Sequence, residues 1–232
     1  MQYLENNWAL VTGASRGIGR QIACGLAERK CNVIVHARTD LHTAETLDLL
    51  SNYGIETFAI SADLSLTSEI DDMIGRLKTG PAIDILYNNA AIQNKWDEIW
   101  DIDQDEWLRT LQINLFAMIR ICNAIAPDMK KRGFGRIVNL TSGIRDVPQL
   151  SPYSVSKAAV DKYSMDLAAE LRGTNVLVNR LDPGWLRTDM GGEHAQHEVE
   201  TVLPGALVPA LLEDNGPSGE LFEAQNYRDF KG

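Results

Sequence analysis

Short apolar runs alternate with segments of helical periodicity along most of the chain. An apolar run that stops at a glycine or a polar residue is typical of a buried strand. Such runs predict strands at 8–12, 32–37, 56–61, 83–87, 136–142, 175–181 and 219–223. Between them, apolar positions recur at helical spacing and predict helices at 18–29, 41–50, 68–77, 104–131 and 151–171.

This alternation indicates one type of fold. Strands that are separated by helices form a parallel sheet with right-handed crossovers. We therefore predict the α/β class: a doubly wound parallel sheet (Rossmann fold) of about seven strands, with helices on both faces. The chain of 232 residues shows no change of composition and no internal repeat, so we expect a single domain over 1–232.

A glycine-rich turn separates the first predicted strand from the first helix. It reads Thr12-Gly13-Ala14-Ser15-Arg16-Gly17-Ile18-Gly19. In this setting glycines let the backbone approach a pyrophosphate, and the start of the helix directs free amides at it. The glycine spacing differs from the general dinucleotide fingerprint, G-x-G-x-x-G, but the strand-turn-helix context still predicts a nucleotide site.

The end of the second strand bears on the choice of cofactor. Many NAD-binding proteins place an acidic residue there, on the ribose hydroxyls. Arg38 occupies this place instead, and Arg16 in the glycine turn is its expected helper. Two cations near the adenosine ribose favour a 2'-phosphate, so we predict NADP(H) as the cofactor. Asp40, two residues later, remains an alternative ribose ligand that would favour NAD.

Tyr153 and Lys157 form the most chemically suggestive pair. They are four residues apart, so they lie on one helix face. Ser151 is the predicted N-cap and Pro152 suits the first helical position, which places Tyr153 in the first turn. There the helix dipole and the Lys157 charge are expected to lower the Tyr153 pKa. A phenol in this position is a candidate general acid or base.

The centre of the long predicted helix, 113–125, is apolar on nearly every side. A helix that covers only one sheet face should show a polar side, so we predict a partner subunit here and a homodimer or homotetramer. Pro127 is expected to kink or end the helix. Asn114 is the polar exception in this stretch.

Composition excludes several classes of function. The formal charge of −10 argues against a nucleic-acid partner or an anionic membrane surface. No apolar run approaches 18 residues and the polar start lacks a signal-peptide pattern, so we expect a cytoplasmic protein. Three scattered cysteines suit buried thiols, and we predict no metal site.

Taken in order, the glycine turn, Asn88-Asn89-Ala90, Ser142 and Tyr153 with Lys157 resemble the short-chain dehydrogenase/reductase family over nearly the whole length. The resemblance implies a catalytic tetrad of Asn114, Ser142, Tyr153 and Lys157. Tyr153 would exchange a proton with the substrate oxygen, and Ser142 would hydrogen-bond that oxygen. Lys157 would hold the nicotinamide ribose and lower the phenol pKa, and Asn114 would support a water near Lys157.

The resemblance also implies a set of cofactor contacts. The turn would line the pyrophosphate, Asp63 and Leu64 the adenine, Asn88 and Ala90 the ribose, and Thr188 the carboxamide. The full set of expected cofactor-binding residues is Gly13, Ser15, Arg16, Gly17, Ile18, Gly19, Arg38, Asp63, Leu64, Asn88, Asn89, Ala90, Tyr153, Lys157, Pro183, Gly184, Leu186 and Thr188.

Two positions depart from the family pattern. Ala91 stands where the family usually has glycine, and the spacing from Ser142 to Tyr153 is shorter than usual, which shortens the loop at 143–150. Thr141 is an alternative to Ser142 for the hydroxyl role. The stretch from Trp185 to Glu200 is expected to form a mobile lid over the site.

The stretch Asn179 to Gly192 resembles the carbonyl reductase branch of the family. We therefore expect an NADPH-dependent carbonyl reductase acting on a mainly apolar aldehyde or ketone. Two alternatives remain open: an NAD-dependent dehydrogenase that oxidises alcohols, and a cofactor-binding regulatory protein without turnover. The candidate pocket residues are Ile92, Trp96, Ile144, Leu150, Trp185 and Met190.

Overall fold

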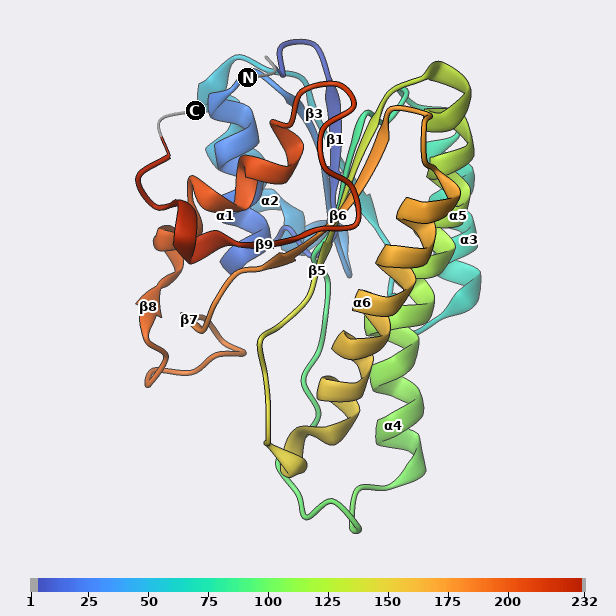
Figure 1. The fold of residues 1–232 in the computed structure, drawn as a ribbon. Coiled ribbons are helices and arrows are strands. Elements are labelled where there is room, and N and C mark those ends of the chain that lie inside the picture. Colours follow the sequence, from blue (N-terminus) through green and yellow to red (C-terminus); the bar gives the residue numbers. More distant parts are fainter. Residues whose placement is uncertain (1–3, 231–232) are drawn as a thin grey trace.

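A computed structural model describes residues 4–230. Its centre is a parallel sheet with the strand order β3-β2-β1-β4-β5-β6-β9 (Figure 1). The predicted class, a doubly wound parallel sheet with helices on both faces, is confirmed. The strands are β1 (Trp8–Val11), β2 (Asn32–Ala37), β3 (Thr57–Ser61), β4 (Ile85–Asn88), β5 (Gly135–Leu140), β6 (Val176–Asp182) and β9 (Leu221–Glu223).

The order of the strands places a binding site. The chain moves from β1 outward through β2 to β3, then returns to pair β4 with the other side of β1. Ligands of open α/β sheets bind at such a reversal, beyond the carboxyl ends of the strands. These ends lie low in Figure 1, where the chain leaves β5 and β6.

Helices cover both faces of the sheet (Figure 1). Alternate residues of each strand point to opposite faces, so Val11 and Val35 join one hydrophobic cluster, and Leu10 and Ile34 join the other. The helices α1 (Gly17–Glu28) and α2 (Ala44–Leu50) lie on one face; α3 (Thr67–Leu77), α5 (Ala117–Arg132) and α6 (Ser151–Glu170) lie on the other, with α4 (Gln104–Leu111) extending beyond it.

The long helical segment differs from its prediction in two respects. A π-helical turn (Gln112–Phe116) joins α4 to α5 and contains Asn114. The helix also continues through Pro127 to Arg132, so of the expected kink or end at Pro127 the end is wrong. Proline removes a helix donor and its ring crowds the carbonyl four residues back, but Pro127 is exposed, and Ile125 and Met129 on either side of it are packed in the hydrophobic core.

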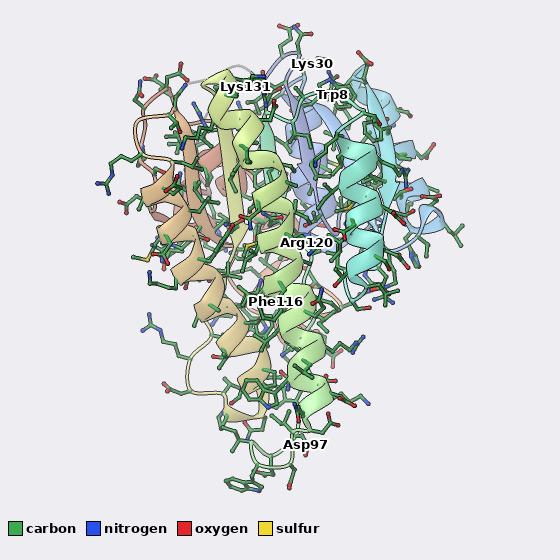
Figure 2. The ribbon with its side chains drawn as sticks, turned by 90° about the vertical axis from the view of Figure 1, so that its right-hand side faces the viewer. Trp8, Lys30, Asp97, Phe116, Arg120 and Lys131 are labelled. Carbon is green, nitrogen blue, oxygen red and sulfur yellow. The ribbon has the colours of Figure 1, made fainter. Side chains whose placement is uncertain are left out.

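The outer side of α5 is more polar than expected for a helix that is apolar on nearly every side over 113–125. Figure 2 shows α5 between α6 and α3, with Phe116 near its lower end and Arg120 one turn higher. Arg120 forms an ion pair with Asp71 of α3, with an N–O distance of 2.6 Å. Exposed apolar side chains on this layer include Leu108 of α4, Phe116 of the π turn and Val155 of the first turns of α6.

The stretch predicted as a lid has its own structure. A short strand β7 (Leu186–Arg187) pairs in parallel with β8 (His197–Glu198). The indole nitrogen of Trp185 donates to the carbonyl of Gly191 at 2.9 Å, which closes the intervening loop. No helix within residues 4–230 is long and apolar enough to cross a membrane.

Candidate active site

A cleft of about 460 Å³ opens at the carboxyl ends of the central strands. Its walls come from the glycine turn, the ends of β2 to β5, the start of α6 and the segment after β6. The predicted site residues that line it are Gly13, Ser15, Arg16, Gly17, Ile18, Gly19, Arg38, Asp63, Leu64, Asn89, Ala90, Tyr153, Lys157, Pro183 and Thr188.

The glycine turn needs its glycines for different reasons. Gly13 has a φ of +64°, and a Cβ there would lie 2.9 Å from the Cα of Ala90. At Gly19 a Cβ would lie 2.4 Å from the carbonyl oxygen of Gly13, so this glycine lets α1 pack directly against the turn. Gly17 begins α1, and no side chain of the described chain caps the amides of this helix. These amides can therefore receive an anion.

Side chains behind the glycine turn hold it in place. The Asn89 side-chain amide donates to the carbonyls of Thr12 and Gly13, at 2.8 and 3.1 Å. The backbone amides of Asn89 and Ala90 both donate to the Thr12 hydroxyl at 3.0 Å. Asn89 therefore supports the turn, in addition to the cofactor contact that the family resemblance implies for it.

His36 is a support that the sequence analysis did not single out. The Gly13 amide donates to its Nδ1 at 3.1 Å, and its Nε2 lies 3.2 Å from the Ala62 carbonyl. Burial lowers the pKa of His36 to about 4, so the ring is neutral at pH 7. Its only sequence signal is a polar residue inside an otherwise apolar strand.

The two arginines expected at the adenosine end both line the cleft, and both already have acidic partners. Arg38 Nε lies 3.8 Å from Asp63 Oδ2, and Arg16 forms a 2.9 Å ion pair with Asp189 of the segment after β7. Asp40 instead starts a 3-10 helix and is not part of the cleft wall. Of the two alternatives for this corner, the geometry favours Arg38.

Tyr153 lines the cleft near the end of β5, and Ser142 lies close to it just outside the cleft wall. The Ser142 side chain acts to lower the pKa of the Tyr153 phenol, and its hydroxyl accepts from the amide of Ile144 at 3.2 Å. Thr141 lines the cleft, but its buried hydroxyl has no hydrogen-bond partner among residues 4–230. The contact with Tyr153 therefore favours Ser142 over Thr141 for the hydroxyl role.

Burial controls the protonation of Tyr153 and Lys157. Lys157 Nζ lies 5.7 Å from the centre of the Tyr153 ring and donates to the Leu140 carbonyl at 2.8 Å. Loss of solvent lowers the pKa of Lys157 to about 8. For Tyr153 the expected lowering of the pKa is wrong: burial raises the pKa of this phenol, and the charge of Asp182 adds to the rise.

Asn114 uses its whole side chain to join two elements. Its carbonyl oxygen accepts from the Ile92 amide at 2.8 Å, and its amide donates to the Ile92 carbonyl and to the Ser156 hydroxyl, at 2.8 and 3.0 Å. Asn114 also lines a cavity of about 10 Å³ together with Lys157 and Asn88. A cavity of this size is close to the minimum for one water.

The start of α6 is capped by a residue that the sequence analysis missed. Ser151 is inside the helix, and its hydroxyl donates back to the Pro148 carbonyl, so its predicted role as N-cap is wrong. A preceding 3-10 turn, Pro148–Leu150, shifts the boundary. Asn94 does the capping: it accepts from the Tyr153 amide at 3.2 Å and donates to the Gln149 carbonyl at 2.9 Å.

Three predicted cofactor ligands are outside the cleft wall: Asn88, Gly184 and Leu186. Asn88 points into the protein, where its amide donates to Asn139 Oδ1 at 2.8 Å and to Cys122 Sγ at 3.2 Å. Leu186 belongs to β7, and its side chain is buried in a hydrophobic cluster. Gly184 supports the wall through its amide, which donates to Asp182 Oδ1 at 2.9 Å.

Comparison with known proteins identifies the family. The family model "short chain dehydrogenase" matches residues 7–199. The chain belongs to this family. The mouse short chain dehydrogenase named dehydrogenase/reductase SDR family member 4 is 35% identical over 188 residues, which cover 80% of this chain and 67% of that protein. The 3-oxoacyl-[acyl-carrier-protein] reductase FabG of Staphylococcus epidermidis is also 35% identical, over 80% of this chain and 77% of that one.

Solved short chain dehydrogenase structures share the whole fold. A 3-oxoacyl-(acyl-carrier-protein) reductase of Agrobacterium tumefaciens with NADP bound is 28% identical, with a TM-score of 0.83 over 95% of this chain and 93% of that one. A Brucella melitensis reductase of the same name with bound NAD is 26% identical, with a TM-score of 0.85 over 95% and 90%. Short chain dehydrogenases of this shape thus include both NADP-bound and NAD-bound examples.

The apolar residues predicted to form the substrate pocket of this short chain dehydrogenase differ in whether they line the cleft, are buried in the core or are exposed. Ile92 and Met190 line the cleft. Leu150 is buried beneath the start of α6, whereas Trp96 is 67% exposed, outside the cleft wall. Trp185 is half exposed and is held by its bond to Gly191. The expected apolar pocket is therefore only partly assembled around Tyr153.

Proposed function

We propose that this oxidoreductase is an NADPH-dependent carbonyl reductase for a mainly apolar aldehyde or ketone. The observation that supports it most directly is that Tyr153 and Lys157 line the same cleft as Arg16 and Arg38, with Ser142 close to Tyr153 just outside the cleft wall. The sequence resemblance to the carbonyl reductase branch around Trp185 points the same way.

The cleft fits a dinucleotide by its construction. The amides at the start of α1 lack a side-chain cap among the described residues, and the turn before them is held open by glycines. Arg38 and Arg16 would meet the 2'-phosphate, and Pro183 would lie beneath the nicotinamide. When bound, NADPH would supply the hydride for the carbonyl carbon.

Tyr153 has the protonation state that a proton donor needs. Because burial raises its pKa, the phenol keeps its proton at neutral pH until the substrate oxygen develops charge. Ser142 would hydrogen-bond the same oxygen, and Lys157, charged below about pH 8, would stabilise the phenolate that forms. Asn114 would hold a water in the small cavity beside Lys157.

Oxidation of NADPH tests the proposal. Purified protein is mixed with NADPH and a panel of aldehydes, ketones and quinones, and loss of cofactor absorbance is followed. We expect turnover with apolar members of the panel. No turnover by folded protein with NADPH bound would favour a regulatory cofactor-binding protein instead.

An NAD-dependent alcohol dehydrogenase is the second candidate, and one observation favours it. Arg38 already faces Asp63, and Arg16 already forms an ion pair with Asp189. A 2'-phosphate would have to displace an acidic partner from each arginine. Reduction of NAD by a panel of secondary alcohols, faster than oxidation of NADPH by the matching ketones, would select this candidate.

We also propose a homodimer or homotetramer that forms through α4, the π turn and α6. Leu108, Phe116 and Val155 are each about half exposed there, on the helical layer viewed in Figure 2. Covering this apolar surface would favour association. Light scattering should give a mass at least twice the 25.7 kDa of one chain; a stable monomer at micromolar concentration would contradict the proposal.

A further inference from the structure

A single carboxylate joins the turns that follow β5 and β6. Asp182, the last residue of β6, accepts from the amide of Gly184 at 2.9 Å through Oδ1. Its other oxygen, Oδ2, lies against the backbone of Gly143. The fit is close, because a Cβ added to Gly143 would lie only 2.8 Å from Asp182 Oδ2.

These two turns carry the parts between which the reaction is proposed to occur. Ser142 directly precedes Gly143, and its side chain lies close enough to Tyr153 to affect the pKa of the phenol. Pro183, between Asp182 and Gly184, lines the cleft. A shift of the carboxylate would therefore change the position of Ser142 relative to both Tyr153 and the floor of the cleft.

Asp182 also places negative charge beside the proton donor. Its charge acts on both Tyr153 and Lys157 of α6 and raises the pKa of each, against burial in the case of Lys157. The other charged groups that act on Asp182 are Asp161 of α6 and Glu223 of β9. Burial raises the pKa of Asp182 itself above that of an ordinary aspartate.

We propose that Asp182 is a positioning residue, whose carboxylate clamps the Ser142-Gly143 turn to the Pro183-Gly184 turn and so sets the Ser142 hydroxyl against Tyr153. The proposal rests on the proposed function, because it assigns Asp182 a part in proton transfer by Tyr153. Asp182 acts through its neighbours and does not touch the reacting atoms.

Asp182→Asn is the direct test. The asparagine keeps one acceptor oxygen but must place an N–H₂ against either Gly184 or Gly143, so the fit to the two turns is disturbed and the charge is lost. A misplacement of about 1 Å can cost about 100-fold in rate, so we expect kcat to fall by about 10- to 100-fold. The Kd of NADPH, measured by fluorescence titration, should change by less than about threefold, which corresponds to about 0.65 kcal/mol.

The pH profile separates positioning at the proton donor from a general structural role. With one negative charge removed, the alkaline limb of kcat/KM for reduction should move to lower pH, because Tyr153 and Lys157 lose their protons more easily. Glu223→Gln is the matched control: it removes a nearby carboxylate that bonds Asn226 and neither turn. It should leave kcat unchanged.

A second variant keeps the test decisive if Asp182→Asn does not fold. Gly143→Ala leaves the charge in place but pushes the carboxylate away, so kcat should fall while the alkaline limb stays nearer that of the wild type. Wild-type kcat in either folded variant would overturn the clamp. If Tyr153→Phe is fully active, the proposed function fails; if it is inactive and Asp182→Asn is normal, only the role of Asp182 fails.

Discussion

The two ends of the cleft hold their functional side chains in different ways. At the catalytic end Lys157 is 5% exposed and bonded to a backbone carbonyl, and the backbone amide of Tyr153 is bonded to the Asn94 side chain. At the adenosine end the side chains of Arg16 and Arg38 are 74% and 60% exposed, and each faces a carboxylate rather than the backbone.

This difference separates what the fold fixes from what a ligand can rearrange. A buried, bonded group cannot change its partner without leaving a polar atom unsatisfied, which costs about 1–3 kcal/mol. An exposed ion pair contributes only about 0–1 kcal/mol, so a phosphate can displace its carboxylate. The proposed chemistry therefore depends on the buried end, and cofactor choice depends on the exposed one.

The largest effect is expected at the buried end. General acid catalysis contributes about 10²- to 10⁴-fold, so Tyr153→Phe should lower kcat by at least 100-fold and leave the Kd of NADPH nearly unchanged. Tyr163→Phe removes the same atom from the same helix, where the hydroxyl donates to Asn123 of α5, and is the control. A Tyr153→Phe variant that keeps more than about a tenth of the rate would mean that another group donates the proton, since a tenfold change is only about 1.4 kcal/mol.

At the exposed end the next largest effect is on cofactor choice. A hydrogen bond to a charged group contributes about 1.5–3 kcal/mol, so losing the Arg38 contact should weaken NADPH binding by roughly 10- to 150-fold, with little change for NADH. Arg38→Asp should reverse the preference, because a carboxylate repels the 2'-phosphate and accepts from free ribose hydroxyls.

Titration of NADPH and NADH against wild type and Arg38→Asp tests this reversal. Arg76→Asp makes the same change of charge near the end of α3, outside the cleft, and controls for long-range electrostatics. Equal wild-type affinities for the two cofactors, or a variant that still prefers NADPH, would remove Arg38 from the site and return Asp40 to consideration.

The same contrast explains what could be predicted from the sequence. The existence of the strands and the shared helix face of Tyr153 and Lys157 follow from apolar periodicity and helical spacing, which the core enforces. The supports at His36, Asn94 and Asp182 were not found. His36 and Asn94 bond partners that are distant in the chain, so no local pattern marks them. Asp182 bonds Gly184 locally, but its approach to Gly143 joins two distant segments.

Burial was also the source of a wrong prediction. From the sequence, the helix start and Lys157 were expected to lower the Tyr153 pKa, but the depth of the phenol in the folded chain raises it. The loss of the Ser151 cap has a similar origin, since the loop that carries Asn94 supplies the acceptor instead. Rules that use only residues near in the sequence could predict neither the burial of Tyr153 nor its contact with Asn94.

The pH dependence of the rate should reflect the buried lysine. The Lys157 pKa is lowered to about 8, so the ammonium is present below that pH and is lost as the pH rises through it. Tyr153, with its raised pKa, keeps its proton over this range. We expect kcat/KM for reduction to be level between about pH 6 and 7.5 and to fall about tenfold by pH 9, as one essential proton is lost. A profile that stays level to pH 10 would show that the Lys157 charge is not needed.

The smallest effect is expected from the carboxylate that competes for Arg16. Asp189 must release Arg16 before a 2'-phosphate can take its place, and an exposed pair of this kind contributes at most about 1 kcal/mol. Asp189→Asn should therefore tighten NADPH binding by up to about fivefold and leave NADH unchanged, since about 1.4 kcal/mol corresponds to a tenfold change in Kd. Glu193→Gln is the matched control, because it removes the same charge from the same segment, where Glu193 lies near His194 and not Arg16. The gain should shrink as salt is raised, because screening already weakens the exposed pair in the wild type. An equal gain for NADH, or from Glu193→Gln, would show that Asp189 acts through the overall charge of the cleft mouth and not by occupying Arg16.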